Sequence, residues 1–194
     1  MTLPRRDVLY HTYADYLTWP EGLRDELING AAYAKEPPAP SRSHQQVVGE
    51  LYFQIRLALE GKPWEAYLAP FDVRLPKAGE VDAKIDTVVQ PDVLVVSDLG
   101  KLDQRGMRGA PDWLAEVLSA ATASHDQTIK LPVYERAGVL EVWFVHPTDR
   151  VLTIYRLEEG RYGRPTVLAM KGRTPIGAIP GVIIDWDRLP RERE

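Results

Sequence analysis

The sequence predicts an α/β fold, more narrowly α+β, in which helices flank a mixed β-sheet. Two observations support this class. Five apolar segments have the length and composition of strands, and two other segments, one before the first strand and one between the third and fourth, carry apolar residues at helical spacing. One domain over residues 1–194 is expected, because a chain of this length fits one domain and can bury about 70% of its surface.

Both longer helices are predicted to begin with a capping box, in which a serine and a glutamine three residues later satisfy backbone N–H groups. These pairs are Ser43 with Gln46, and Ser124 with Gln127. Gly61 and Gly138 are expected to end the two helices. Pro132 lies inside the second helix, over 124–137, and is expected to kink it.

The strands are expected at residues 66–75, 88–96, 113–118, 139–146 and 151–157. Residues 93–96 are apolar on both faces, which is typical of a central strand. Asn29-Gly30 predicts a type I′ hairpin turn, and a short amphipathic stretch runs from Thr12 to Pro20. Residues 36–41 are expected to form a connector and 191–194 a frayed tail.

The composition restricts the classes of site that the chain can carry. There are no cysteines, so any metal must be held by oxygen or imidazole ligands. We find no apolar run of about 18 residues and no secretory signal, and we expect a cytoplasmic protein without a membrane span. The net charge of −4 argues mildly against a surface that binds nucleic acid everywhere.

Two carboxylates are the first candidate site residues. Asp92 follows Gln90-Pro91 at the start of the predicted central strand, and Glu116 lies in the next strand among apolar neighbours. An ionised carboxylate in such surroundings is costly unless a cation or hydrogen bonds compensate it. The alternatives are a turn residue for Asp92 and an exposed strand edge for Glu116.

The two predicted helices supply further candidates. Asp126, Lys130 and Tyr134 are spaced four residues apart, so they share one helix face, and Lys130 can point back toward the carboxylates. A solvated Asp–Lys pair is the alternative. His44 lies on the first turn of the other helix, where it is either a buried structural histidine or a site residue.

Contact with nucleic acid is predicted less directly. Lys101, Arg105 and Arg108 form a basic loop between the two acid-bearing strands, and such a loop can meet phosphates or simply be solvated. The other histidines, His11, His125 and His146, show no partner pattern and are interpreted as structural or surface residues. A homodimer is expected by default, because two-fold oligomers are the commonest and cutting two strands favours paired sites.

The motifs together resemble one family. Glu26-Leu-Ile-Asn-Gly30, His44, Gln90-Pro-Asp-Val93, Glu116-Val-Leu-Ser119, Asp126, Lys130 through Tyr134, Gly138-Val and Glu141-Val-Trp143 occur in this order. From about residue 15 to about 157 the chain resembles a large bacterial family of restriction-endonuclease-like proteins. That family belongs to the PD-(D/E)XK phosphodiesterase superfamily.

The resemblance implies a restriction endonuclease-like fold and a Mg²⁺- or Mn²⁺-dependent DNA endonuclease. It implies that Asp92, Glu116 and the carbonyl of Val117 bind the metal. Lys130 would replace the usual superfamily lysine, whose position is occupied by Leu118. Glu26 and His44 would be further site residues that bind a second metal or orient water.

Two other functions remain open from the sequence. One is a nuclease-like fold without turnover that binds nucleic acid or protein, which the net charge, Leu118 and Pro132 favour. The other is a metal-free hydrolase that uses Asp92 and Glu116 as an acid–base pair, but this function leaves Lys130 without a role.

Overall fold

A mixed seven-stranded sheet forms the centre of the computed structural model, which describes residues 7–20, 25–34 and 41–189. Its strand order is β12-β11-β10-β9-β6-β3, and β13 also pairs with β11, along residues 151–154. Only β9 and β10 are parallel neighbours within this sheet of described residues. The strands are β3 (Glu65–Leu68), β6 (Val93–Val96), β9 (Trp113–Val117), β10 (Glu141–His146), β11 (Val151–Glu158), β12 (Arg161–Tyr162) and β13 (Thr166–Ala169).

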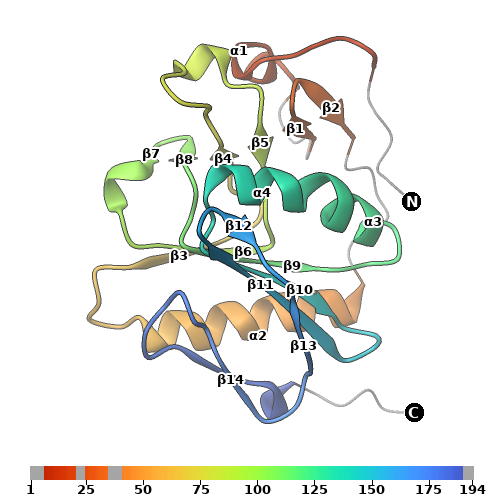
Figure 1. Cartoon of the computed structure of the whole chain (residues 1–194), viewed down its shortest axis with the longest axis vertical. Helices are drawn as coiled ribbons and strands as arrows, with labels where there is room; N and C mark the ends of the chain where they lie inside the picture. The colour runs from red at the N-terminus through yellow and green to blue at the C-terminus, as the bar shows by residue number, and fades with distance from the viewer. Residues whose placement is uncertain (1–6, 21–24, 35–40, 190–194) are drawn as a thin grey trace.

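Helices cover both faces of this sheet, as predicted. Figure 1 shows α2 (Arg42–Ala58) on one side of the strands and α4 (Leu131–Ala137) on the other. Alternate residues of the central strands face each helix, so Val93 and Val95 pack with α2, whereas Leu94 and Val96 pack with α4. This arrangement explains why residues 93–96 are apolar throughout.

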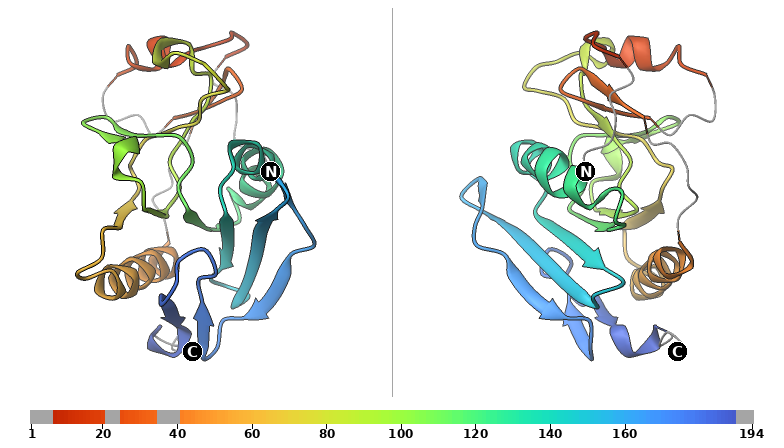
Figure 2. Two further views of the ribbon diagram at one scale, coloured as in Figure 1. Left: turned by 60° about the vertical axis from the view of Figure 1, so that its left-hand side comes forward. Right: turned by 90° about the vertical axis from the view of Figure 1, so that its right-hand side faces the viewer.

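A second, smaller sheet has the order β2-β1-β5-β4-β8-β7. Figure 2 shows it at the end of the molecule opposite to the C-terminus. Its strands are β1 (Glu26–Ile28), β2 (Ala31–Tyr33), β4 (Val73–Arg74), β5 (Val88–Val89), β7 (Leu102–Asp103) and β8 (Gly106–Arg108). Asn29 and Gly30 join β1 to β2 with φ values of 50° and 79°, which confirms the predicted hairpin turn.

Two of the predicted strands are wrong as continuous strands. The segment 66–75 divides into β3 and β4, and the segment 88–96 divides into β5 and β6, so that each crosses from one sheet to the other. Each break contains a proline, Pro70 or Pro91, which cannot donate a ladder hydrogen bond. The second break places Asp92 at the junction of the two sheets.

Both predicted capping boxes are also wrong. The cap of α2 is Ser41, whose hydroxyl accepts a hydrogen bond from the backbone N–H of His44 at 3.2 Å. The predicted second helix consists of α3 (Ala123–His125), a π-helical turn η3 (Asp126–Lys130) and α4. Its first turn has no side-chain cap, whereas Gly138 ends α4 in the left-handed conformation, as predicted.

The remaining elements lie at the two ends of the molecule, apart from a turn next to β7 (Figure 1). Helix α1 (Tyr13–Tyr16) is the predicted short helix. Strands β14 (Arg173–Pro175) and β15 (Ile183–Asp185) were not predicted, nor were the 3₁₀ turns η1 (Asp82–Lys84), η2 (Leu99–Lys101) and η4 (Trp186–Arg188). Residues 36–40 of the predicted connector and the predicted tail lie outside the described residues. None of the helices in the described ranges is long and apolar enough to span a membrane.

Candidate functional site

Asp92 lies where the chain passes from the smaller sheet into β6. Its Oδ2 accepts a hydrogen bond from the backbone N–H of Val117 at 2.7 Å, so the carboxylate is fixed against the end of β9. His44, from the first turn of α2, places Nε2 3.3 Å from the same oxygen. The side chains of Asp92 and His44 are 14% and 12% exposed, which makes them the more accessible part of the cluster.

Glu116 is buried in the interior of the larger sheet. Strand β9 lies between β6 and β10, and the residue is 1% exposed, so the alternative of an exposed strand edge is wrong. Leu114 and Leu118 share its face, which α4 covers. Lys130 Nζ lies 2.6 Å from Glu116 Oε1, and the hydroxyl of Tyr134 donates to the same oxygen.

Lys130 is fully buried, so it does not form the solvated pair with Asp126 that was the alternative. Its Nζ lies 2.8 Å from Glu26 Oε1 and 3.7 Å from Asp126 Oδ1, in addition to the contact with Glu116. The π-helical turn ends at Lys130, where the N–H of Leu131 donates to the carbonyl of Asp126. The lysine therefore joins the helix to carboxylates from both sheets.

Glu26 connects the hairpin with the segment that precedes Asp92. Its Oε1 accepts hydrogen bonds from Lys130 Nζ and from the backbone N–H of Gln90, at 2.8 and 2.9 Å. Because Gln90 and Asp92 flank Pro91, the two ends of this short segment are fixed in different sheets. The structure thus brings together five predicted site residues, namely Glu26, His44, Asp92, Glu116 and Lys130.

Electrostatics in this cluster favour retention of protons. The pKa of Glu116 is raised to about 8, mainly by burial and also by the carboxylates of Asp126, Asp92 and Glu26, against the lowering effect of Lys130. Burial alone would lower the pKa of Lys130, but Glu116 and Glu26 raise it well above its ordinary value. Burial and the charge of Glu116 also raise the pKa of Tyr134.

The donor chemistry of the cluster suits a hard divalent cation. Three carboxylates interact with the single lysine, and a fourth, Asp92, interacts with Glu116, so the fully ionised cluster has excess negative charge that a cation would offset. Among the described residues no group of three or more Asp, Glu or His side chains is arranged as a complete metal site. Mg²⁺ needs only one or two carboxylates and completes its shell with water, so Asp92, Glu116 and the Val117 carbonyl remain a suitable set.

The predicted basic loop is an ordered part of the smaller sheet. Lys101 donates to the carbonyl of Ala110 at 2.8 Å, and Arg108 bonds Asp82 at 2.7 Å. Arg105 follows β7, where its backbone N–H donates to Asp103 at 2.8 Å. The structure therefore directs two of these three cations toward partners within the chain.

Sequence reasoning did not identify His125 as part of this cluster. Its side chain is fully buried, its ring lies 4.7 Å from that of Tyr33, and its Nε2 lies 3.7 Å from Glu26 Oε2. His125 precedes Lys130 by five residues, a spacing that puts side chains on different faces of an α-helix. The π-helical turn changes that relation, and the α-helical pattern used for prediction contains no signal for it.

Comparison with known proteins adds a family and a fold. The model of the Uma2 family, described as "Putative restriction endonuclease", matches residues 13–187, which extends beyond the segment that first suggested such a family. A crystal structure from Anabaena variabilis, described as a putative nuclease belonging to DUF820, is similar with a TM-score of 0.72 and 19% identity. The similarity covers 92% of this chain and 96% of that one, and at this identity it shows the fold alone. None of the curated proteins that were compared matches the chain.

Proposed function

The chain belongs to the Uma2 family, "Putative restriction endonuclease", and from this membership we propose that it is a metal-dependent endonuclease that hydrolyses phosphodiester bonds in DNA. The observation that carries the proposal is the buried Lys130 between Glu26 and Glu116, in the same cluster as Asp92. A lysine and carboxylates in one site provide the charges that phosphodiester hydrolysis requires.

Asp92, Glu116 and the carbonyl of Val117 are the residues that would hold Mg²⁺ or Mn²⁺. Asp92 is fixed to the backbone of Val117, so two of these residues keep a constant relation to one another. When bound, the cation would supply positive charge that polarises the phosphate and favours deprotonation of water. Hard oxygen donors of this kind select such cations over softer metals.

Lys130 would stabilise the negative charge that develops on the phosphate oxygens. Its raised pKa keeps the ammonium group protonated, and the group has three N–H donors. Glu26 and Glu116 accept from it at 2.8 and 2.6 Å, which fixes its position, while Tyr134 holds Glu116. A charge that is positioned before the reaction stabilises the transition state without further reorganisation.

His44 and Asp92 mark the side from which solvent would reach the site, because they retain partial exposure in an otherwise buried cluster. His44 Nε2 lies 3.3 Å from Asp92, so His44 would orient this carboxylate. An imidazole can also accept a proton from water, which is a common role of histidine in hydrolysis.

The test is a nicking assay on supercoiled DNA with Mg²⁺ or Mn²⁺, with single-stranded DNA and RNA as further substrates. Asp92→Asn, Glu116→Gln and Lys130→Met should each lower the rate about 100-fold or more. Asp149→Asn, an exposed carboxylate in the turn between β10 and β11, is the matched control and should retain activity. Nicking that survives in the three site variants would reject the proposal. DNA binding without any nicking would instead identify a binding module.

A further inference from the structure

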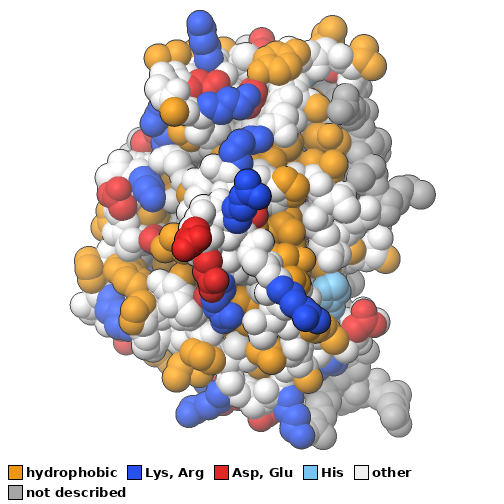
Figure 3. Space-filling model, viewed as in Figure 1, with side chains coloured by type: hydrophobic (Ala, Val, Ile, Leu, Met, Phe, Trp, Pro, Cys, Tyr) orange, Lys and Arg blue, Asp and Glu red, His pale blue; other side chains and the backbone are white. Residues whose placement is uncertain are grey.

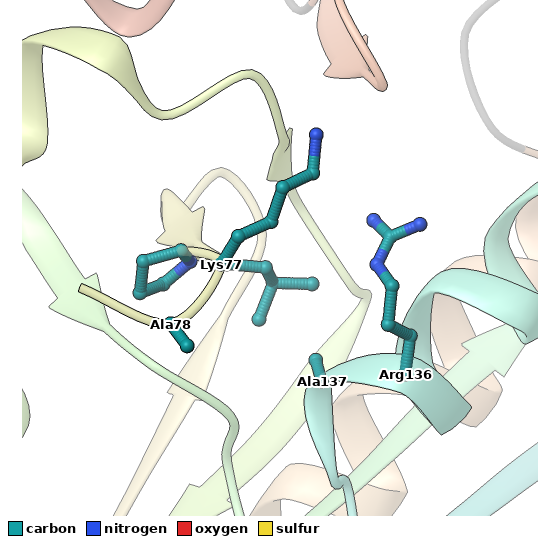
Figure 4. A pocket seen from close by; sticks show the side chains of 6 residues that line it. Lys77, Ala78, Arg136 and Ala137 are labelled. Carbon is teal, nitrogen blue, oxygen red and sulfur yellow. The ribbon is translucent and has the colours of Figure 1, made fainter. Parts of the chain in front are cut away.

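A cavity of about 240 Å³ lies outside the cluster described above, between the segment that follows β4 and the end of α4. Its lining consists of Leu75, Pro76, Lys77, Ala78, Arg136 and Ala137. Figure 4 shows the side chains of Lys77 and Arg136 extending into the same space from its two walls. The lining therefore combines two cations with small apolar side chains and contains no acidic side chain.

The charge of Arg136 is not neutralised by any residue that the structure describes. Lys77 contacts Asp86, whereas Arg136 has no hydrogen bond or ion pair with any described residue. The carboxylate beside it in sequence, Glu135, accepts from the backbone N–H of Tyr162. An exposed guanidinium group at a cavity can form two parallel hydrogen bonds to a phosphate group.

The same face of the molecule carries further positive charge. Figure 3 shows Lys and Arg side chains in a row from the top of the view to its middle, over α4 and the strands drawn above it in Figure 1, with acidic side chains beside the upper ones. The chain as a whole has a net charge of −4, so these cations are a local feature. Local positive charge of this kind attracts a polyanion.

We propose that the cavity between Lys77 and Arg136 is a phosphate subsite that binds a backbone phosphate of the nucleic acid. This inference rests on the proposed function, because it assumes that a nucleic-acid strand reaches the cluster around Lys130. Arg136 is two residues from Tyr134 on α4, which corresponds to about 3 Å along the helix axis. Residues two apart on an α-helix point to nearly opposite sides, so the buried Tyr134 faces the cluster whereas the exposed Arg136 faces solvent. A strand that reaches the cluster would contact Arg136 where it passes over the outer face of α4.

The experiment measures DNA binding by the full chain in EDTA, by fluorescence anisotropy at several NaCl concentrations between 50 and 200 mM. Arg136→Gln should lower the magnitude of the slope of log K against log salt by about 1, equally for unrelated DNA sequences. Arg56→Gln, an exposed arginine on α2 across the sheet, is the matched control and should leave the slope unchanged. An unchanged slope for Arg136→Gln would overturn the subsite and assign Arg136 only to stabilising the end of α4.

A titration with inorganic phosphate, followed by ¹H–¹⁵N NMR, separates this proposal from the proposed function. Phosphate should shift the side-chain Nε–H of Arg136 and the backbone N–H of Ala78 in the wild type, and the Ala78 shift should be lost in Arg136→Gln. If the protein binds DNA with the expected slope change but nicks nothing, the subsite stands and the catalytic proposal fails. If phosphate binds but DNA does not, nucleic acid is rejected as the ligand of the cavity.

Discussion

The burial of Lys130 depends on the carboxylates around it. Removing an ammonium group from water costs several kcal/mol, and the contacts with Glu26 and Glu116 offset that cost. These partners come from β1 and β9, which belong to different sheets. A single side chain therefore links the chemistry of the cluster to the stability of the fold.

Replacing Lys130 by methionine should destabilise the protein by about 3–5 kcal/mol, because buried carboxylates lose their cation. Adding Glu26→Gln to this variant should recover part of the loss, because Glu26 is a buried carboxylate that contacts Lys130 at 2.8 Å. Arg173→Met is the control, since Arg173 forms an exposed pair with Asp185 at 3.7 Å and should cost less than about 1 kcal/mol. Urea unfolding at pH 7 in EDTA measures all of these differences. Equal losses for Lys130→Met and Arg173→Met would contradict the buried ion cluster.

Glu116 should make the metal-free protein less stable as the pH rises. Its pKa is about 8 in the folded protein against an ordinary value of 4.5, so between these pH values the folded state holds a proton that the unfolded state has released. The stabilisation that this proton gives the folded state is complete below pH 4.5 and is lost as the pH approaches 8. The free energy of unfolding falls by no more than about 1.4 kcal/mol per pH unit over this range. Urea unfolding at pH 5, 6 and 7 should show a shallower decline for Glu116→Gln than for the wild type. Identical slopes for the two proteins would reject the raised pKa.

At the scale of single elements, local patterns predicted which helices and strands exist better than they predicted where each begins and ends. The hairpin, α2 and the central strands follow from turn chemistry and periodicity, because those signals are local. The strand breaks at Pro70 and Pro91 were also encoded locally, but the apolar runs on both sides concealed them. The π-helical turn could not be predicted, since it depends on how Lys130 packs between the two sheets.

Pro132 should be nearly neutral for stability, although a proline inside a regular helix costs about 3 kcal/mol. The preceding π-helical turn places it in the first turn of α4, where a missing N–H removes no helical hydrogen bond. Pro132→Ala should therefore change the free energy of unfolding by less than about 1 kcal/mol. Gly138→Ala provides the comparison, because an alanine at φ of 88° should destabilise the protein by about 1–2 kcal/mol. A gain near 3 kcal/mol for Pro132→Ala in urea unfolding would show that the proline strains the helix.

At the scale of the whole molecule, the site lies where the two sheets and the two longer helices meet. Glu26 comes from the smaller sheet, Glu116 from the larger one, His44 from α2 and Lys130 from the turn before α4. The order of the motifs along the sequence indicated which residues belong to the site. The contacts among these residues could not be predicted without the fold. This is also why His125, which ends α3 directly before the π-helical turn of Lys130, was missed.

A cation that binds where these elements meet should stabilise the whole fold, because it binds the native state alone. Mn²⁺ at about 100 times its dissociation constant should add about 2.7 kcal/mol and raise Tm by about 5–10 °C. The increase should be larger at pH 8 than at pH 6, because the proton on Glu116 competes with the metal. Differential scanning calorimetry with wild type, Asp92→Asn and the control Asp149→Asn measures this effect. Equal shifts in Asp92→Asn and the wild type would place the ion elsewhere, whereas loss of the shift in Asp92→Asn alone would locate it at the junction of the two sheets.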